Sequence, residues 1–222
     1  MIFAGVDEAG RGPVLGPLVV AGVVLNKRDL DDLVDLGLTD SKLLSRAKRE
    51  ELYAEIMKRA IDHKVIILPA ESIDTNRQTT TNLNKIEFNA AVEILNSLNN
   101  WNQAYVDAFD RNAKRLQFVL SNTIQHEVVA EHFADRNYPV VSAASIIAKV
   151  IRDREIDKLH EEFGVDFGSG YPHDPKTSKF LETYYSTHKE LPMIARKSWN
   201  TAKKLVEAHE QKQLDEFFSG EG

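Results

Sequence analysis

Two adjacent acids, Asp7 and Glu8, lie between an apolar run at residues 2–6 and the Gly-Arg-Gly sequence at residues 10–12. The run predicts a short buried strand, and the glycines allow the backbone to bend sharply and to approach a ligand closely. Neighbouring residues of a strand point to opposite faces, so the two acids can share one site only if the strand ends there. Carboxylates, exposed amides and a guanidinium together suit a divalent metal beside a phosphate. The alternative is an exposed acidic turn that follows a strand.

Two further acids follow predicted strands. Asp107 comes directly after the strand expected at residues 103–106, and Asp135 comes just beyond the strand expected at residues 128–133. Strands alternate with helices after a leading hairpin formed by the first two strands, which predicts an α/β fold with a mixed sheet. Sites in such sheets form beyond the strand ends. The shared position of the four acids therefore favours a functional site over an exposed turn.

Apolar residues at helical spacing predict the elements that support this sheet. Helices are expected at about residues 45–61, 82–98, 140–163, 176–188 and 199–210, with a helical stretch around residues 116–120. Further strands are expected at residues 18–25 and 64–68, the latter ended by Pro69. The expected organisation is a catalytic domain at residues 1–175, a helical C-terminal region at residues 176–210 and a tail at residues 211–222.

Composition narrows the class of protein. The 222 residues are enough for a substantial core, and the absence of cysteine means that a metal must be held by oxygen or imidazole. No signal peptide or membrane-spanning run is expected, which predicts a soluble, cytoplasmic protein. The formal net charge of −6 counts mildly against a nucleic-acid partner, although bound cations invert the local field around a group of carboxylates.

The motifs, taken in order, resemble those of a known family. GVDEAGRGPVLGPLVVA begins at Gly5 and is followed by TDSKLLS, NLN, AYVDAFD, ADRNYPVVSAASIIAKVIRDREI, GSGYPHDPKT and RKSWNT, which ends at Thr201. Together they make the chain similar to type 2 ribonuclease H, also called ribonuclease HII, and most similar to its archaeal members. The chain departs from the family pattern at Phe133, where a lysine commonly precedes Ala-Asp, and at His173.

The resemblance implies a ribonuclease H-like fold and hydrolysis of the RNA strand of RNA/DNA hybrids. It also implies cleavage on the 5′ side of single ribonucleotides embedded in duplex DNA, which leaves a 3′-hydroxyl and a 5′-phosphate. Carried over residue by residue, the resemblance makes Asp7, Glu8, Asp107 and Asp135 the catalytic acids that bind two Mg²⁺ or Mn²⁺ ions. Such ions activate the attacking water and neutralise the departing oxygen.

A protein distinguishes RNA from DNA by the 2′-hydroxyl. The resemblance assigns contacts with this group to the backbone of Gly10, Arg11 and Gly12 and to the hydroxyl of Tyr171. The ring of Tyr171 is expected to pack on the adjoining sugar. These contacts would select a ribonucleotide even when it is embedded in DNA.

Other polar residues are expected to contact the substrate without reading its sequence. The resemblance assigns phosphate contacts to Lys42 and Arg46, with an additional hydroxyl from Ser41. Asn82 and Asn84 either bind the DNA strand or cap the helix that follows, and capping is the preferred interpretation.

The tail contains a second motif, formed by Gln211, Leu214, Phe217 and Phe218. Its pattern resembles the motif by which archaeal and eukaryotic proteins bind PCNA, the sliding clamp. Leu214 and the two aromatic residues are expected to form an apolar anchor. The alternative is an amphipathic last helix whose phenylalanines pack on the protein's own core.

Two other functions remain as alternatives. The first is a two-metal DNA nuclease or resolvase on the same fold, but such an enzyme has no use for groups that contact a 2′-hydroxyl. The second is a non-catalytic, clamp-tethered protein that binds hybrids, but the presence of all four acids argues against lost catalysis. The chain is expected to act as a monomer.

Overall fold

The computed structural model describes residues 1–38, 44–78 and 82–219 of the chain. The chain forms two compact units, to which separate stretches contribute. The first unit contains Met1–Arg11, Leu18–Ile67 and Thr81–Arg154, and the second contains Gly12–Pro17, Leu68–Thr80 and Glu155–Gly222. The division into domains at residues 175 and 210 stays a prediction.

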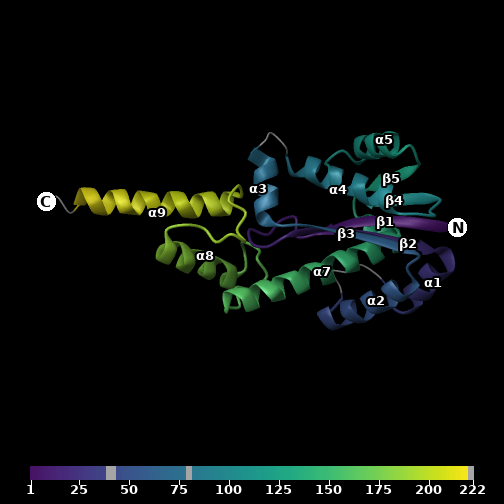
Figure 1. Ribbon diagram of the computed structural model, residues 1–222, viewed down its shortest axis with the longest axis horizontal. Coiled ribbons are helices and arrows are strands. Elements are labelled where there is room, and N and C mark those ends of the chain that lie inside the picture. The colour runs from purple at the N-terminus through teal and green to yellow at the C-terminus, as the bar shows by residue number, and fades with distance from the viewer. Residues whose placement is uncertain (39–43, 79–81, 220–222) are drawn as a thin grey trace. The chain divides into compact units, whose positions relative to one another are not determined.

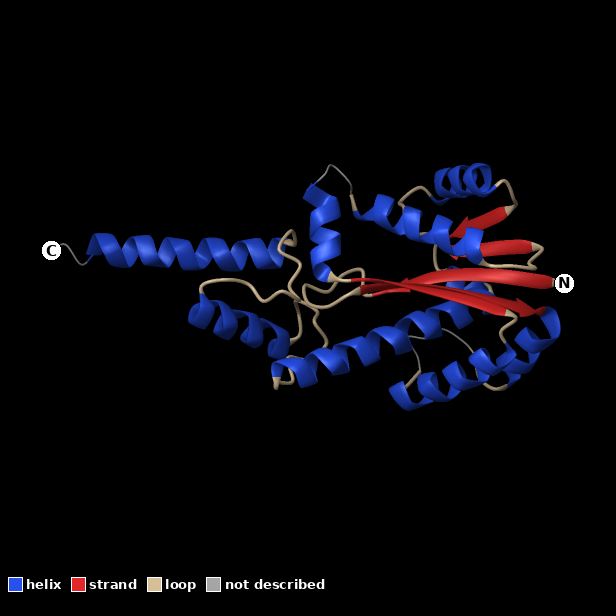
Figure 2. Cartoon of the chain, viewed as in Figure 1, coloured by secondary structure: helices blue, strands red, loops and turns tan. Residues whose placement is uncertain are grey.

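A five-stranded mixed sheet forms the centre of the first unit (Figures 1 and 2). Its strands, in the spatial order β3-β2-β1-β4-β5, are β1 (Ile2–Ala9), β2 (Leu18–Asn26), β3 (Asp62–Leu68), β4 (Gln103–Asp107) and β5 (Val128–Glu131). β1 pairs with β2 in an antiparallel hairpin and with β4 in parallel. The antiparallel ladder of β1 continues to Ala9, whereas its parallel ladder ends at Val6.

Helices cover both faces of this sheet. One face carries α1 (Lys27–Asp35), α2 (Arg46–Arg59) and the first part of α7 (Pro139–Phe163), and the other carries α4 (Leu83–Ser97) and α5 (Ala113–Ile124) (Figure 1). The short α6 (Ala134–Asn137) connects β5 to α7. Because both faces are covered, β2 reads as a continuous apolar run that is buried up to its last residue.

Glycine is required where helices approach the sheet most closely. A Cβ atom on Gly5 would lie 2.2 Å from the carbonyl oxygen of Val140, at the start of α7. A Cβ atom on Gly22 would lie 2.2 Å from the side chain of Ile94 in α4. Neither position has room for a larger residue, so these glycines set the distance between sheet and helices.

The second unit is mainly helical. It contains α3 (Ala70–Gln78), the end of α7, α8 (Pro175–His188) and α9 (Asn200–Ser219). Its core is formed by the buried residues Val14, Leu15, Ile156, Phe167, Leu181, Ile194, Ala195 and Ala202. The guanidinium of Arg196 is fully buried against this core, and its Nε donates to the carbonyl oxygen of Gly16 at 3.1 Å.

The expected mixed sheet, the leading hairpin and the main helices are confirmed, with differences at the ends of elements. β1 runs three residues further than the expected end at Val6, because β2 continues to supply hydrogen-bonding partners. β5 ends at Glu131 rather than near residue 133, so Asp135 follows the strand at a greater distance and lies in α6. The expected end of the last helix near residue 210 is wrong, because α9 continues to Ser219.

α3 is not predicted from the sequence, because its residues are mostly polar. No helix in the described ranges is long and apolar enough to cross a membrane.

Candidate active site

Asp7 and Asp107 lie side by side on the face of the sheet that α7 covers. β1 and β4 are parallel, and their last registered pair, Val6 and Val106, immediately precedes the two acids. Asp7 is 5% exposed, and the Ser145 hydroxyl of α7 donates to its carboxylate. The two carboxylates therefore start from equivalent positions of neighbouring strands, where the pairing of β1 with β4 ends.

Glu8 starts from the opposite face of the strand, as alternation requires, but its carboxyl group forms a hydrogen bond with that of Asp7. It lies near Glu87 of α4 and Arg11, which both act on its pKa. Arg11 forms an ion pair with Glu87, and its second terminal nitrogen donates to the Asn84 side chain at 2.6 Å. Glu87 is only 1% exposed, so this guanidinium offsets the charge of a buried acid.

Although Asp7 and Glu8 start on opposite faces, their charges act on each other and on Asp107. Burial raises the pKa of Asp7 well above its usual range, and repulsion from Glu8 and Asp107 adds to the rise. Burial also raises the pKa of Glu8 to about 8, with further rises from Glu87 and Asp107 that Arg11 partly offsets. β1 does not end at these acids, which was the condition for a shared site, because it continues to Ala9. The charges of the three carboxylates nevertheless interact with one another.

Asp135 reaches this region through the chain turn before α6. The backbone amide of Ala134 donates to Asp107 Oδ1 at 2.8 Å, and Asp135, which is 4% exposed, follows directly. Phe133 takes a left-handed conformation (φ 60°) to start α6, and its ring is 57% exposed beneath the Arg136 guanidinium at 4.9 Å. The departure from the family pattern thus places an exposed aromatic ring where a lysine is common.

The donor chemistry of the four acids fits a divalent cation. Carboxylate oxygens are hard ligands, and the mutual repulsion that raises the pKa values of Asp7 and Glu8 is what a bound cation would relieve. Among the described residues, no three acidic or histidine side chains are grouped as a ready-made ion site. The fit therefore rests on donor type and charge.

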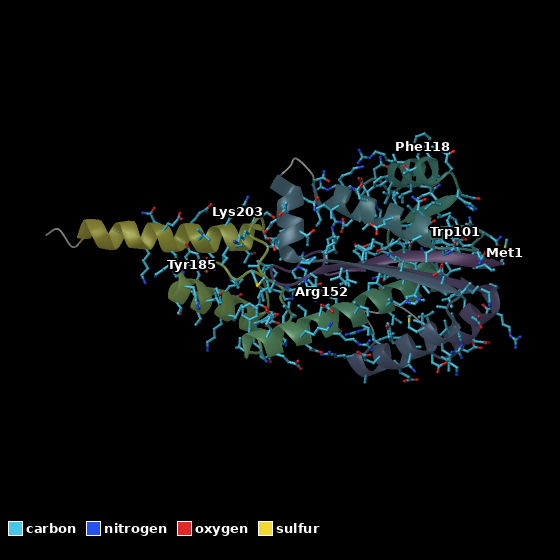
Figure 3. The ribbon with its side chains drawn as sticks, viewed as in Figure 1. Met1, Trp101, Phe118, Arg152, Tyr185 and Lys203 are labelled. Atoms are coloured by element: carbon cyan, nitrogen blue, oxygen red, sulfur yellow. The ribbon has the colours of Figure 1, made fainter. Side chains whose placement is uncertain are left out.

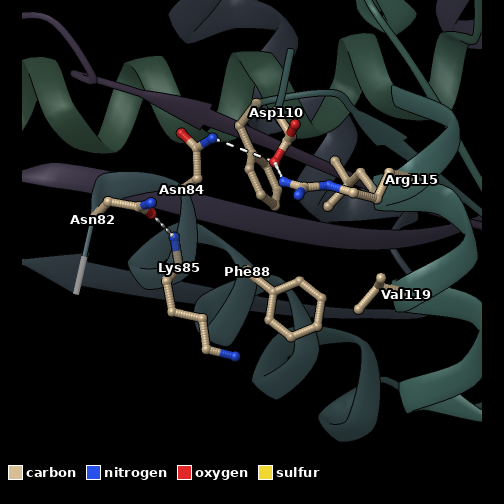
Figure 4. A pocket seen from close by; sticks show the side chains of 9 residues that line it. Asn82, Asn84, Lys85, Phe88, Asp110, Arg115 and Val119 are labelled. Carbon is tan, nitrogen blue, oxygen red and sulfur yellow. Dashed lines mark hydrogen bonds and ion pairs between the residues drawn. The ribbon is translucent and has the colours of Figure 1, made fainter. Parts of the chain in front are cut away.

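The partner of Arg11, Asn84, belongs to a polar network with Asp110 and Arg115, which Figure 4 shows. The side-chain amide of Asn84 donates to Asp110 Oδ2 at 3.4 Å, and the Arg115 guanidinium donates to the same oxygen at 2.6 Å. Asn82 caps α4 as predicted, accepting from the Lys85 amide at 3.0 Å, but Asn84 does not cap. The capping interpretation is therefore confirmed for Asn82 and wrong for Asn84.

A pocket of about 310 Å³ lies beside this network, entirely within the first unit (Figure 4). The aromatic rings of Phe88 and Phe109 line it, together with Lys85, Arg115 and the two asparagines. The Lys85 ammonium lies 4.5 Å from the centre of the Phe88 ring.

Tyr171 and Gly12 lie together in the second unit. A Cβ atom on Gly12 would lie 3.4 Å from the Tyr171 ring, so a side chain at this position would fill the space next to the ring. The ring of His173 lies 5.5 Å from that of Tyr171. Asp174 holds the start of this loop by accepting from the Ser169 amide at 2.8 Å and from its hydroxyl at 2.7 Å.

The remaining predicted residues are less closely tied to this geometry. Gly10 takes a positive φ of 89° at the end of β1, which favours glycine. Arg46 is exposed at the first position of α2. Ser41 and Lys42 lie outside the described residues, as do the side chains of the tail motif except that of Gln211, which donates to Asp215 at 2.8 Å.

Glu87 and Ser145 also belong to this region, although neither was predicted from the sequence. Glu87 occupies the apolar stripe of α4, four residues after Leu83 and before Ala91. An acid on a buried stripe requires a partner, so its position was a usable signal. Ser145 belongs to a run of small residues in α7, and nothing in that run distinguishes it from a packing residue.

Comparisons with known proteins agree with the motifs. The family model of ribonuclease HII matches residues 4–202. The ribonuclease HII of Pyrococcus furiosus is 45% identical, over 98% of this chain and 99% of its own. The solved ribonuclease H2 of Pyrococcus horikoshii is 43% identical with a TM-score of 0.86, over 94% of this chain and 98% of that one. A solved PCNA:RNase HII complex from Archaeoglobus fulgidus matches at 44% identity and a TM-score of 0.82, over 90% and 96%.

Proposed function

Because the chain belongs to the ribonuclease HII family, it is a ribonuclease H with a ribonuclease H-like fold, and we propose the details of its reaction. It cleaves the RNA strand of RNA/DNA hybrids, and it also cuts on the 5′ side of single ribonucleotides in duplex DNA. The products carry a 3′-hydroxyl and a 5′-phosphate.

The observation that carries this proposal is the convergence of Asp7, Glu8 and Asp107, with Asp135 next to the amide that binds Asp107. Buried acids that repel one another destabilise a fold, so their retention together argues for a function. In this proposal the four acids hold two Mg²⁺ or Mn²⁺ ions, which supply charge to activate a water and to stabilise the leaving oxygen.

The surrounding residues orient these acids. The Ser145 hydroxyl and the Glu8 amide, at 2.7 Å, both donate to Asp7, and the Ala134 amide donates to Asp107. Hydrogen bonds of this kind fix a carboxylate so that its remaining oxygen lone pairs are available to hold a cation. Arg11 limits the negative charge near Glu8 through its ion pair with Glu87.

We further propose that Tyr171 and the backbone of residues 10–12 contact the 2′-hydroxyl. The close approach of Gly12 to the Tyr171 ring supports a joint role, because one sugar can meet a hydroxyl and a backbone amide together. Lys42 and Arg46, with the hydroxyl of Ser41, contact phosphates in this proposal. In this proposal one chain supplies every contact with the substrate, and the enzyme acts as a monomer.

The decisive experiment measures cleavage of an RNA/DNA hybrid, of a DNA duplex with one ribonucleotide and of an all-DNA duplex. Each is incubated with Mg²⁺, Mn²⁺ or EDTA. We expect metal-dependent cleavage of the first two and 5′-phosphate ends on the products. Equal cleavage of the all-DNA duplex would favour the two-metal DNA nuclease instead. Tight binding of hybrids without any cleavage would favour the non-catalytic alternative.

The tail supports a second proposal, binding to PCNA through Gln211, Leu214, Phe217 and Phe218. A relative of 44% identity has been solved as a complex with PCNA. α9 continues through the motif, and Figure 1 shows its last turns extending past α8. The core contacts described for α9 involve Ala202, Leu205 and His209, all before the motif.

Clamp binding is tested by calorimetry with purified archaeal PCNA. Replacement of both phenylalanines, Phe217→Ala with Phe218→Ala, should abolish binding, whereas Lys212→Ala on the same helix should leave it intact. Unchanged melting of the double variant would confirm that its tail does not pack on the core. Wild-type chain that fails to bind the clamp would contradict the proposal.

A further inference from the structure

A cationic hollow of about 320 Å³ lies within the second unit, apart from every residue assigned above. It is lined by Asp74, Arg77, Lys197, Ser198 and Lys203. The first two belong to α3, and the others belong to the start of α9 and the segment before it. Figure 3 marks Lys203 near the beginning of α9. Residues far apart in the sequence thus form one surface feature.

The lining is held in place by its own contacts. Asp74, which is 8% exposed, accepts hydrogen bonds from the backbone amides of Lys197 at 2.6 Å and Ser198 at 3.1 Å. The Arg77 guanidinium lies 4.8 Å from the centre of the Trp199 ring. The backbone before α9 and one cation of α3 are therefore positioned before any ligand arrives, which lowers the entropic cost of binding.

The hollow carries an excess of positive charge in an acidic chain. Three cations line it, and its single acid already accepts two backbone amides. The chain as a whole has a formal net charge of −6, so the positive charge of this hollow is opposite in sign to the charge of the chain. An anion is the ligand that such a site attracts.

Ser198 points to the kind of anion. Its Oγ atom is buried and makes no hydrogen bond with the part of the chain that the structure describes. Native proteins leave few buried polar groups in this state, and a bound ligand is one way to satisfy them. Three cationic side chains around one hollow, with a serine in the lining, match the several acceptor oxygens of a phosphate group.

We propose that this hollow binds a phosphate group of the nucleic-acid backbone. The inference rests on the proposed function, because it supplies the substrate duplex with an anchor beyond the residues that contact the 2′-hydroxyl. Such a contact carries no sequence information and does not depend on the sugar. It therefore strengthens binding of hybrid and all-DNA duplexes equally.

The test compares two neighbouring lysines of α9. Lys203 lines the hollow, whereas Lys204 is exposed and does not. Binding of full-length Lys203→Gln and Lys204→Gln to a hybrid and to an all-DNA duplex is measured in EDTA, so that cleavage does not interfere. Lys203→Gln should weaken both complexes about tenfold and reduce the slope of log affinity against log salt by about 0.9, with little change for Lys204→Gln. Equal losses for the two variants would overturn the proposal.

A second pair of measurements separates backbone phosphate from free anion. Ser198→Ala keeps every charge and should still weaken duplex binding several-fold. Inorganic phosphate is titrated while Trp199 fluorescence is followed in a Trp101→Phe background. A free-anion site would respond to phosphate while both Ser198→Ala and Lys203→Gln keep wild-type duplex affinity, and this result would overturn the proposal. These binding readouts do not require cleavage, so a failure of the proposed nuclease activity is detected separately.

Discussion

Two groups of carboxylates in this molecule experience opposite environments. In the first unit, burial and mutual repulsion raise the pKa of Glu8 to about 8 and that of Asp7 well above its usual range. In the second unit, hydrogen bonds from the amide and hydroxyl of Ser169 lower the pKa of Asp174 to about 2. The surroundings thus disfavour ionisation of Asp7 and Glu8, whereas they favour ionisation of Asp174.

This difference is what the proposed function predicts between acids that bind a cation and an acid that only stabilises the fold. Asp174 accepts backbone donors, caps α8 and fixes the loop that leads to Tyr171, so its charge stabilises the fold. Asp7 and Glu8 are ionised only at a cost that the fold alone does not recover. This cost in folding free energy is expected for carboxylates that bind a cation.

The largest expected effect comes from removing one of the four acids. Asp107→Asn should reduce cleavage of an RNA/DNA hybrid by about 1000-fold or more, because the cluster acts as a unit. The control is Asp31→Asn, which changes an exposed acid of α1 that pairs with Lys27. Cleavage within about threefold of wild type for Asp107→Asn would remove this acid from the catalytic set.

The cluster should also give stability an unusual pH dependence. Because the folded-state pKa of Glu8 lies near 8, above its usual 4.5, the folded state holds a proton in this window that the unfolded state has lost. In EDTA, the free energy of unfolding should therefore fall as pH rises from about 4.5 to 8, by an amount on the order of a few kcal/mol. Urea unfolding at several pH values measures this slope, and Glu8→Gln should flatten it. An unchanged slope in that variant would show that another group titrates.

A smaller effect is expected from the tyrosine of the second unit. Tyr171→Phe keeps the ring beside Gly12 and removes only the hydroxyl, so it should lower selectivity for the ribonucleotide-containing duplex over all-DNA duplex by about tenfold. The matched control is Tyr184→Phe in α8, whose ring contacts Phe163 and Phe180. Relative cleavage rates of competing substrates give the ratio, and equal selectivity in both variants would exclude the 2′-hydroxyl role.

The smallest expected effect concerns Asp174. Its pKa is lowered to about 2 in the folded state, against an ordinary 3.8, so its contribution is present above pH 4 and is lost as pH falls toward 2. Asp174→Asn should therefore be slightly less stable than wild type at neutral pH, and this difference should shrink in acid. Denaturant midpoints between pH 3 and pH 7 measure it. A difference that is constant with pH would mean that the charge does not contribute.

Sequence reasoning succeeded where local pattern determines structure. The apolar runs of β1 and β2 and the helical stripe of α4 specify their elements. The positions after expected strands singled out the four acids, and their catalytic role stays a prediction. The exact end of β1 was not predictable, because it depends on the partner strand that pairs with residues 7–9.

The partners of the acids were harder to predict. Glu87 and Arg11 are 76 positions apart, so only the fold reveals that they form an ion pair. Asn84 looked like a capping residue beside Asn82, and tertiary contacts with Arg11 and Asp110 override that local preference. The hollow at Ser198 depends on α3, a polar helix without a clear apolar stripe.

The most direct test of this account combines activity and stability in one variant, Asp7→Asn. The amide keeps the hydrogen bond from Glu8 and removes a buried charge. At pH 8 in EDTA, the variant should melt at a higher temperature than wild type, and with Mg²⁺ or Mn²⁺ it should no longer cleave the hybrid. Retained cleavage, or a lower melting temperature in EDTA, would contradict the claim that this carboxylate is kept for catalysis at the expense of stability.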